Sequence, residues 1–307
     1  LLVNKEFLDL AEQLKSSVSC TVRLNELMSG HTSFKIGGPA DILVLPESIE
    51  QLREVLKVVK ETVVPLTLLG NGSNVLVRDK GIRGIVIKLG NMLRHFYEAE
   101  DLLVFGSGYS LALASYKAME CGKTGMEFAV GIPGSIGGAV YMNAGAYDGE
   151  MQNIVNCVKV MDLQGNERVL TAEELNFGYR KTSLQNSGLI VTEVTLKMPS
   201  GNKDEIKSKM DDFSHRRISK QPLEMPSAGS MFKRPPGYFA GTLIDQAGLK
   251  GYTVGGAQIS TKHAGFVVNV GGATAADVLQ LIKDVQTKIK AGVGVELQPE
   301  VLVIGEE

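Results

Sequence analysis

A short glycine-rich segment, residues 70–74 (GNGSN), is the first part of this chain of 307 residues whose residue types suit chemistry. Glycine lets another group come close to main-chain N–H donors, and consecutive N–H groups in a turn form a concavity that binds anions. The same letters suit a plain hairpin turn, because Asn-Gly favours a two-residue connection between paired strands. Both interpretations stay open. The candidate cofactor contacts here are Gly70, Asn71, Gly72, Ser73 and Asn74.

A second glycine-rich segment, residues 128–147 (FAVGIPGSIGGAVYMNAGAY), carries no charge. Five glycines and Pro133 interrupt it, so it does not fit a membrane-spanning helix, which needs a mostly apolar run of this length. Tight packing would explain such a segment by itself. Together with residues 70–74, however, it favours a dinucleotide held by main chain, with one segment at the pyrophosphate and one beside the ring system. The candidate contacts are Gly134, Ser135, Gly137, Gly138, Asn143 and Gly145.

Two common nucleotide-binding motifs are not satisfied. The dinucleotide fingerprint G-x-G-x-x-G fails, because Val75 stands where the third glycine belongs. Residues 121–124 (CGKT) are similar to the end of a P-loop, but Lys117 replaces the earlier glycine and the preceding segment has a helical pattern. Neither a Rossmann site nor a Walker site is therefore expected.

Residues 214–237 (SHRRISKQPLEMPSAGSMFKRPPG) form a third candidate site, in which five basic residues face one acid, Glu224. A charged run is commonly a solvated face, and charge alone does not decide between the two interpretations. Ser230 lies among these cations, in a segment that prolines stiffen. Because arginine binds carboxylate or phosphate through paired hydrogen bonds, the pattern favours a pocket for an anionic substrate. The basic residues are Arg216, Arg217, Lys220, Lys233 and Arg234.

Composition narrows the class of protein further. The net charge of −2 argues against a dedicated nucleic-acid binder, which usually carries a basic excess. The four histidines lack metal-site spacing, so we expect no metal. Three cysteines without a C-x-x-C pair indicate neither a disulfide framework nor a zinc site, and they fit a reducing, cytoplasmic setting. The N-terminal segment has the pattern of an amphipathic helix and lacks the basic start and apolar core of a signal peptide.

The elements that must position these segments alternate between helices and strands. Ser48 and Gln51 form a capping pattern, and apolar residues recur at helical spacing after them. We expect helices over residues 48–60, 110–121, 204–217 and 274–290. We expect strands over 41–46, 66–69, 75–77, 84–89, 102–106 and 293–304, with strand-like runs from 154 to 198 around a turn at 164–166. The segment 199–202 (PSGN) is the best candidate for a domain boundary.

These segments are part of a wider set of motifs that resembles the UDP-N-acetylenolpyruvoylglucosamine reductase family over nearly the whole chain. The matching motifs are HTSFKIGGPAD (31–41), GNGSNVLVRD (70–79), GIPGSIGGAVYMNAGAYDGE (131–150), FGYRKTS (177–183), RRISKQPLEMPSAGSMFKRP (216–235), KHAGFVVN (262–269) and PEV (299–301). The wording KQPLE…PSAGS is similar to the shorter type of the family, which lacks an extra tyrosine loop.

The resemblance implies an α+β protein with an FAD-binding fold of the vanillyl-alcohol-oxidase (PCMH) type. Residues 1–199 would form the FAD-binding region, in two subdomains with a break near 90–110, and residues 200–307 a C-terminal α+β substrate-binding domain. The implied cofactor is non-covalent FAD, with NADPH as co-substrate. UDP-N-acetylglucosamine enolpyruvate would be reduced to UDP-N-acetylmuramate for peptidoglycan synthesis. We expect a cytoplasmic monomer without nucleic-acid partners or membrane insertion.

The resemblance also implies three catalytic residues. Arg180 and Glu300 would lie at the enolpyruvyl carboxylate, where negative charge develops and must be stabilised. Glu300 could donate a hydrogen bond if burial keeps it protonated, and Ser230 would deliver the proton. Each residue also has a structural alternative. Arg180 would be a surface ion-pair partner, Glu300 a charge on an edge strand, and Ser230 a hydroxyl in a turn. The substrate-binding candidates are Tyr147, Arg217, Lys220, Lys233 and Arg234.

Two residues depart from the family pattern. Arg234 stands where many members have asparagine, which puts the substrate contact at that position in question, and Met142 stands where some members place a polar residue. Two other functions compete with the reductase. One is a different FAD oxidoreductase on the same fold that acts on another anionic substrate, and the other is a non-catalytic module that binds a UDP-sugar or a flavin.

Overall fold

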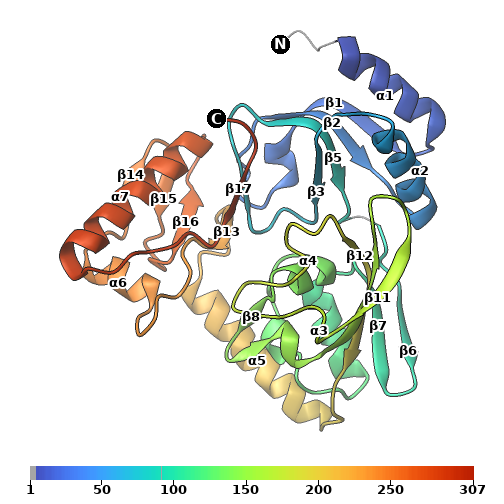
Figure 1. Ribbon diagram of the computed structural model, residues 1–307. Coiled ribbons are helices and arrows are strands. Elements are labelled where there is room, and N and C mark those ends of the chain that lie inside the picture. Colours follow the sequence, from blue (N-terminus) through green and yellow to red (C-terminus); the bar gives the residue numbers. More distant parts are fainter. Residues whose placement is uncertain (1–4, 91) are drawn as a thin grey trace. The chain divides into compact units, whose positions relative to one another are not determined.

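The chain forms two compact units, whose segments can be followed by the sequence colours of Figure 1. The computed structural model describes residues 5–90 and 92–307. The first unit comprises the residues up to Leu24, Ile42–Asn71 and Ile85–Arg216. The second comprises Asn25–Asp41, Gly72–Gly84 and Arg217–Glu307. The second unit is therefore assembled from three separate stretches of sequence.

Two helices and a four-stranded sheet share one core of the first unit. The helices are α1 (Lys5–Ser17) and α2 (Ile49–Lys60), and the strand order is β1-β2-β5-β3, with β3 parallel to β5. The strands are β1 (Thr21–Leu27), β2 (Pro39–Leu45), β3 (Leu66–Leu69) and β5 (Ile82–Lys88). Apolar side chains of both helices and of the strands are buried together, among them Leu14, Ile42, Leu52, Val55 and Ile85.

The start of α2 follows the predicted capping pattern, with one difference. Ser48 Oγ accepts the N–H of Gln51 at 3.2 Å. Gln51 Oε1 accepts the N–H of Glu47 at 2.7 Å, so the reciprocal bond goes to the residue before the cap. The helix predicted over 48–60 is confirmed, because its first N–H groups have partners before the backbone ladder begins.

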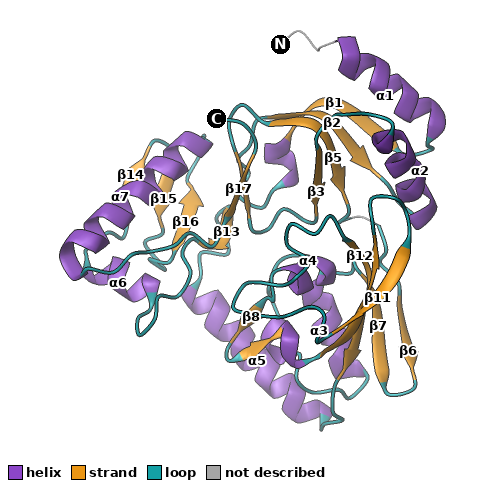
Figure 2. Cartoon of the chain, viewed as in Figure 1, coloured by secondary structure: helices purple, strands orange, loops and turns teal. Residues whose placement is uncertain are grey.

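A second part of the first unit contains an antiparallel sheet of five strands, in the order β11-β10-β12-β7-β6. Its labelled strands β11, β12, β7 and β6 are orange in Figure 2. The predicted turn after β10 is confirmed, because Gly165 has φ +85° and Asp162 Oδ1 accepts N–H groups across the turn. A second core covers this sheet and includes Phe105, Val158 and Val194. The strands are β6 (Phe96–Ala99), β7 (Leu102–Gly106), β10 (Val155–Met161), β11 (Glu167–Thr171) and β12 (Ile190–Lys197).

The helices of this region include one inside the uncharged segment. Ser135 Oγ accepts the N–H of Gly138 at 3.3 Å and caps the short helix α4. The predicted helices 110–121 and 204–217 are confirmed, and the latter extends to Lys220. The helices are α3 (Leu111–Glu120), α4 (Ile136–Tyr141) and α5 (Lys203–Lys220), with 3₁₀ turns at Glu127–Ala129 and Met151–Asn153 and short paired strands β8 (Gly145–Ala146) and β9 (Gly149–Glu150).

The second unit pairs a four-stranded antiparallel sheet, in the order β13-β16-β15-β14, with two helices. The buried stripe of α7 packs in this core as the periodicity predicts, through Val278, Leu281, Ile282, Val285 and Ile289. The elements are β13 (Ser227–Ser230), α6 (Ala240–Gln246), β14 (Thr253–Val254), β15 (Ala257–Ile259), β16 (Phe266–Asn269) and α7 (Ala275–Val293), with a 3₁₀ turn at Met28–His31.

Helix α7 begins on a carboxylate from a distant segment. Asp79 Oδ1 accepts the N–H of Ala275 at 2.7 Å, and Asp79 Oδ2 accepts the N–H of Ala276 at 2.9 Å. Thr274 and Asp277 complete a capping box at the same end. A negative charge is favourable at a helix N-terminus, so Asp79 joins the segment 72–84 to the C-terminal part of the unit.

The predicted final strand over 293–304 is wrong for most of its length. Helix α7 continues to Val293, and Gly294 ends it in the left-handed conformation, with φ +72°. Only β17 (Leu302–Ile304) is a strand, and it lies parallel to β4 (Val75–Val77). Residues 292–294 form a helix end and not a strand, because glycine tolerates the left-handed conformation of the C-cap.

The hairpin interpretation of residues 70–74 is also wrong. Strand β3, before the segment, pairs with β5, whereas strand β4, after it, pairs with β17. The segment therefore connects two different sheets. A turn between paired strands is excluded, and the glycines need another explanation.

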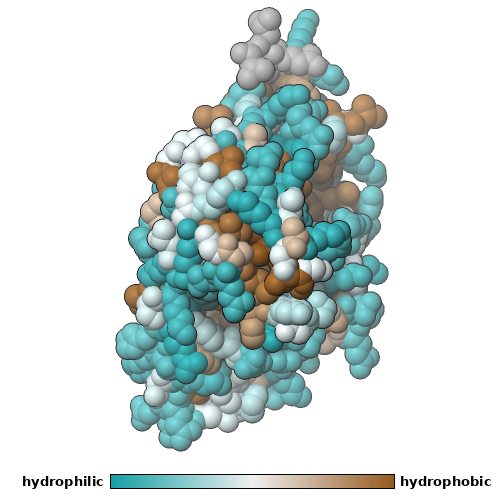
Figure 3. Space-filling model, turned by 90° about the vertical axis from the view of Figure 1, so that its left-hand side faces the viewer, coloured by the Kyte–Doolittle hydropathy of each residue, from teal (hydrophilic) through white to brown (hydrophobic). Residues whose placement is uncertain are grey.

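Two features are absent from the described residues. No helix in residues 5–90 and 92–307 has both the length and the apolar character needed to cross a membrane. Within the same residues, no group of three or more His, Cys, Asp and Glu side chains could hold a metal ion. On the face drawn in Figure 3, hydrophilic residues predominate and hydrophobic residues are interspersed among them.

Candidate active site

The two glycine-rich segments meet in the first unit. Gly70 directly follows β3, and Ser135 directly precedes α4. A Cβ atom built on Gly70 would lie 3.5 Å from Ser135 Oγ, which is van der Waals contact. Asn71 lies against Gly90 in the same region, through its side-chain oxygen. Residues far apart in the sequence therefore form one surface, as a shared cofactor site requires.

Some candidate glycines are required by the protein's own packing. A Cβ on Gly137 would lie 2.7 Å from Ser107 Cβ, and one on Gly145 would lie 2.6 Å from a main-chain oxygen of β9. In the second unit, Gly72 has φ +66°, and its Cβ would overlap the carbonyl group of His31. Gly134 likewise has φ +127°, which side chains rarely adopt. These four glycines have a structural explanation.

Gly70 and Gly138 have no such explanation. Neither has φ in the left-handed region. An added Cβ would meet Ser135 Oγ at 3.5 Å and 3.4 Å respectively, an ordinary contact. Glycine inside a helix costs about 1 kcal/mol relative to alanine, so Gly138 destabilises α4 without relieving a clash. Glycine at these two positions fits a large cofactor that lies directly against main chain.

Asn143, predicted as a cofactor contact, has its side chain buried within the protein. It lies just after α4 with φ +42° and no exposed surface. Its Nδ2 donates to the Gly178 carbonyl at 3.0 Å and to Glu150 Oε2 at 3.1 Å, and its Oδ1 accepts the Gln152 N–H at 3.0 Å. The amide is satisfied internally, so its effect on a cofactor would pass through the backbone that it holds.

Arg180 lies in a tight turn in which Gly178 and Lys181 exchange both main-chain hydrogen bonds. Its φ of +56° is left-handed, which is uncommon for a residue with a side chain and costs about 1–3 kcal/mol. The guanidinium donates to the carbonyl oxygens of Asn143 at 3.3 Å and Gly145 at 3.1 Å. The side chain is therefore directed toward the second glycine-rich segment.

Tyr147, predicted at the substrate, packs on α5 within the first unit. Its ring stacks on that of Phe213, with centroids 4.3 Å apart and planes 12° from parallel. Its hydroxyl donates to the Phe213 carbonyl at 3.4 Å. Tyr147 and Asp148 both have positive φ, of 50° and 64°. The segment after α4 is therefore held in an unusual conformation by contacts on α5.

The second unit brings Ser230 and Glu300 together. The N–H of Glu300 donates to the carbonyl of Met231 at 2.9 Å, so Glu300 lies beside the residue that follows Ser230. Ser230 is exposed at the end of β13, opposite Phe266 of β16. Asn74 Nδ2 donates to the Glu300 carbonyl at 3.2 Å. Two predicted catalytic residues are thus neighbours, and a predicted cofactor contact anchors one of them.

The basic residues of 214–237 have different environments. Arg216 is exposed and pairs with Asp212 on α5 at 2.7 Å, as a solvated face would. Arg217 is buried, with 8% of its surface exposed. Arg234 lies over the ring of Phe239, with its guanidinium carbon 4.0 Å from the ring centroid. Lys220 is exposed and Lys233 is half-buried. The segment is therefore not a uniform solvated face.

Ser33 is a positioning residue that the sequence reasoning did not identify. Its Oγ donates to the Ser227 carbonyl at 2.7 Å, and its N–H donates to the Gly72 carbonyl at 3.1 Å. Its Oγ also lies 3.4 Å from the Ser73 carbonyl oxygen. Ser33 therefore joins the GNGSN segment to β13, the strand of Ser230. The motif HTSFKIGGPAD contained this residue, but no local pattern distinguishes it from its neighbours.

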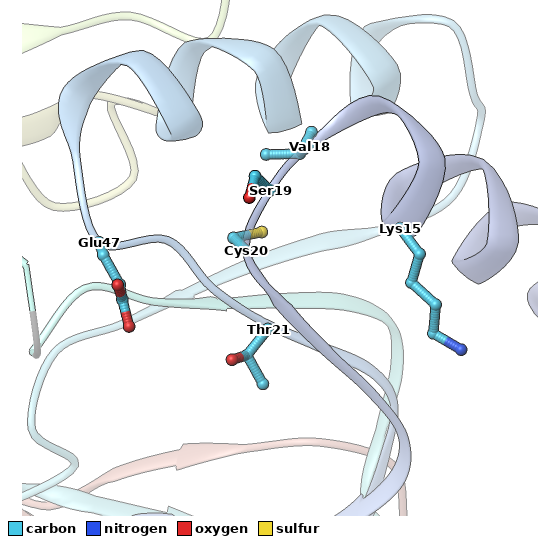
Figure 4. Close-up of a pocket in the computed structure, with 6 residues that line it drawn as sticks. All are labelled: Lys15, Val18, Ser19, Cys20, Thr21 and Glu47. Carbon is cyan, nitrogen blue, oxygen red and sulfur yellow. The ribbon is translucent and has the colours of Figure 1, made fainter.

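A hollow of about 410 Å³ lies at the end of α1 (Figure 4). Lys15 and Glu47 lie on opposite sides of it in the close-up. Burial, with the charges of Glu47 and Glu54, raises the pKa of the Cys20 thiol, which leaves it a weak nucleophile. None of the lining residues is a predicted site residue, so the hollow is not part of the candidate site. They are Lys15, Val18, Ser19, Cys20, Thr21 and Glu47.

His263, in the motif KHAGFVVN, is held in its neutral form. Burial lowers the pKa of its imidazole below the usual 6.5, and the positive charges of Lys250 and Lys220 lower it further. The N–H of Gly265 donates to His263 Nδ1 at 3.0 Å, a bond that needs an unprotonated nitrogen. The imidazole therefore acts as an acceptor that shapes the turn before β16.

Comparison with known proteins covers almost the whole chain. Residues 221–304 match the family model of the UDP-N-acetylenolpyruvoylglucosamine reductase C-terminal domain, and residues 40–171 match an FAD binding domain. The UDP-N-acetylenolpyruvoylglucosamine reductase of Clostridioides difficile (strain 630) is 49% identical over 93% of this chain and 94% of its own. That of Clostridium perfringens (strain SM101 / Type A) is 51% identical over the same shares.

A solved structure is similar over the same extent. The UDP-N-acetylenolpyruvylglucosamine reductase of Thermus caldophilus superimposes with a TM-score of 0.78 and 38% sequence identity. The similarity covers 93% of this chain and 99% of that one. Sequence and fold therefore agree over 93% of the chain.

Replacing Gly138 with alanine is expected to separate cofactor binding from folding. The added methyl has room in the protein, so the thermal stability of the flavin-free protein should hold or rise, because alanine favours helix. Flavin content, measured as the ratio of absorbance near 450 nm to that at 280 nm, should fall. Gly137→Ala is the matched control, and it should lose stability because its Cβ would lie 2.7 Å from Ser107 Cβ. Full flavin content in Gly138→Ala would contradict the assignment.

The lowered pKa of the half-buried His263 predicts a loss of stability in mild acid. Below the ordinary histidine pKa of 6.5 the unfolded chain binds a proton that the folded chain resists, so unfolding becomes easier as pH falls. His263→Asn keeps an acceptor for the Gly265 N–H without this titration. Its melting temperature should fall less than that of the wild type between about pH 7.5 and 5.5. His215→Asn, an exposed change on α5, is the control, and equal slopes in all three proteins would refute the prediction.

Proposed function

Because this chain belongs to the UDP-N-acetylenolpyruvoylglucosamine reductase family, we propose that it reduces UDP-N-acetylglucosamine enolpyruvate to UDP-N-acetylmuramate with NADPH. It is an FAD-containing oxidoreductase of α+β fold, with an FAD-binding fold of the vanillyl-alcohol-oxidase type and a C-terminal domain characteristic of the family. The observation that carries the proposal is about 50% identity to curated reductases over 93% of the chain. Its role would be in peptidoglycan precursor synthesis.

The residues of the glycine-rich segments fit the flavin. Gly70 and Gly138 leave main chain open to a ligand, and Ser135 lies between them. We assign the flavin contacts to these residues, with Asn71, Gly72, Ser73, Asn74, Gly134 and Gly137 beside them. FAD, when bound to these residues, would supply the hydride chemistry between NADPH and the substrate. The protein would bind and orient the flavin and the substrate, and would exclude competing reaction partners.

The residues around the substrate would stabilise charge and deliver a proton. Reduction of the vinyl ether puts negative charge on the carbon beside the substrate carboxylate, so a cation there lowers the barrier. We assign that role to Arg180 and a hydrogen bond to the same group to Glu300. Ser230, exposed beside Glu300, would donate the proton to that carbon. The proposed substrate contacts are unchanged and comprise Tyr147, Arg217, Lys220, Lys233 and Arg234.

The organisation of the chain follows as a separate proposal. We assign residues 1–199 to FAD binding, with a break near 90–110, and residues 200–307 to substrate binding. The family matches at 40–171 and 221–304 support this division. The compact units divide the chain differently, because 25–41 and 72–84 cluster with 217–307. We also propose the shorter type of the enzyme, acting as a cytoplasmic monomer with NADPH rather than NADH.

The proposed reaction makes a direct prediction for the purified protein. It should be yellow, with flavin absorbance, and should sustain NADPH oxidation only when UDP-N-acetylglucosamine enolpyruvate is present. An anaerobic NADPH titration followed by addition of that substrate measures both half-reactions. A colourless protein that does not take up FAD would end the proposal. Rapid reoxidation by oxygen with peroxide formation would favour the alternative, a different FAD oxidoreductase.

Ser230→Ala should separate the two half-reactions. Reduction of the protein by NADPH should stay near the wild-type rate, whereas oxidation by the enolpyruvyl substrate should slow by about a hundredfold or more, as loss of a general acid typically does. Stopped-flow absorbance of the flavin measures both rates. Ser227→Ala removes a hydroxyl from the same strand and should leave both unchanged. Equal slowing of the two half-reactions in Ser230→Ala would indicate a structural role.

A further inference from the structure

The turn that carries Arg180 is held by a side chain that lies outside the motifs. Gln185 Nε2 donates to the Arg180 carbonyl at 3.1 Å and to the Tyr141 carbonyl at 3.2 Å. Met142 Sδ lies 3.7 Å from the same nitrogen. The side-chain amide of Gln185 therefore links the turn to the last residue of α4. Tyr141, Met142, Arg180 and Gln185 all belong to the first unit.

This link acts on a residue that holds an unfavourable conformation. Arg180 has φ +56°, and a residue with a side chain relaxes from that region unless its surroundings hold it there. Gly178 and Lys181 close the turn through main-chain bonds, one of which holds the N–H of the peptide that follows Arg180. Gln185 fixes the other end of the same peptide group, the Arg180 carbonyl. If this carbonyl rotates, the direction in which the side chain leaves the backbone changes.

The guanidinium contacts depend on that direction. Its two donors meet the carbonyl oxygens of Asn143 and Gly145, which follow α4 directly. Gln185 binds the end of the same helix, so helix and turn are clamped at two points. With the carbonyl released, the guanidinium would sample other positions, and charge stabilisation falls steeply when a cation is misplaced by about 1 Å.

We propose that Gln185 is a positioning residue for Arg180, and that it affects reduction of the enolpyruvyl carboxylate substrate only by fixing the Arg180 turn. The inference rests on the proposed function, because it assumes that Arg180 binds the substrate's carboxylate. It adds a residue that makes no contact of its own with the reacting groups. Gln185 acts indirectly, through its hydrogen bond to the main-chain carbonyl of Arg180. Arg180 is the residue that contacts the reacting groups in this proposal.

Thr182 provides a matched control. Its Oγ1 donates to the same Tyr141 carbonyl at 2.9 Å, and its side chain is buried, with 2% of its surface exposed. Thr182→Val removes this bond to the helix and leaves the bond from Gln185 to Arg180 in place. Gln185→Met has nearly the same shape as the wild type and removes both Gln185 bonds. The two variants therefore separate general loosening of the segment from release of the Arg180 carbonyl.

The experiment is a double-mutant cycle on the flavin-loaded protein. Gln185→Met should slow oxidation by the enolpyruvyl substrate by about tenfold, the factor that corresponds to one lost hydrogen bond, and leave reduction by NADPH unchanged. In an Arg180→Ala background the same change should have less than about a twofold effect, because the residue through which it acts is gone. Thr182→Val should lower thermal stability and leave both half-reactions near the wild-type rates.

Two results would overturn the inference. Equal slowing by Gln185→Met with and without Arg180 would show an independent role, and slowing by Thr182→Val to the same extent would show general loosening. A second readout does not depend on the reaction. The NMR order parameter of the Arg180 side-chain Nε–H should fall in Gln185→Met and not in Thr182→Val. If the wild type does not turn over the substrate, the proposed function fails, and an unchanged order parameter would refute the positioning role separately.

Discussion

A fully buried amide must find its hydrogen bonds inside the protein, and in the first unit this constraint applies to Asn143. Its side chain ties the end of α4 to Gly178 and Gln152, and its own carbonyl accepts a bond from Arg180. A positive φ at Asn143 turns the chain at this point. Loss of this one amide would free the helix, the strand after it and the arginine turn together.

The second unit positions its residues mainly through backbone pairing. Glu300 is fixed by a main-chain bond to Met231 and by Asn74, and Ser230 by its place at the end of β13. Ser33 and Asp79, from the two early segments, supply the side-chain bonds that hold this arrangement. The proposed catalytic groups therefore extend from paired backbone, which favours the accurate placement that catalysis requires.

Local signals in the sequence predicted much of the fold, and contacts between distant residues explain the rest. Caps and apolar spacing located α2 and α7, and apolar runs located β3 and β7. The hairpin interpretation failed because the partners of β3 and β4 lie elsewhere in the chain. The sequence cannot distinguish the adjacent glycines 137 and 138. In the structure, Ser107 leaves no room for a side chain at Gly137, whereas Gly138 has room for one. No sequence pattern indicated a role for Gln185, because its two carbonyl acceptors come together only where α4 ends.

The interleaved course of the chain affects how the protein can fold during synthesis. Asn74 is separated from its partner Glu300 by 226 positions, and β4 pairs with β17, which is synthesised much later. The loop-closure entropy of such distant pairing slows folding. The early segments 25–41 and 72–84 therefore leave the ribosome well before residues 217–307, with which they cluster, are synthesised. Meanwhile the early segments 25–41 and 72–84 expose apolar residues such as Phe34 and Leu76, which are buried only in the finished unit, and chaperone binding would protect them during this interval.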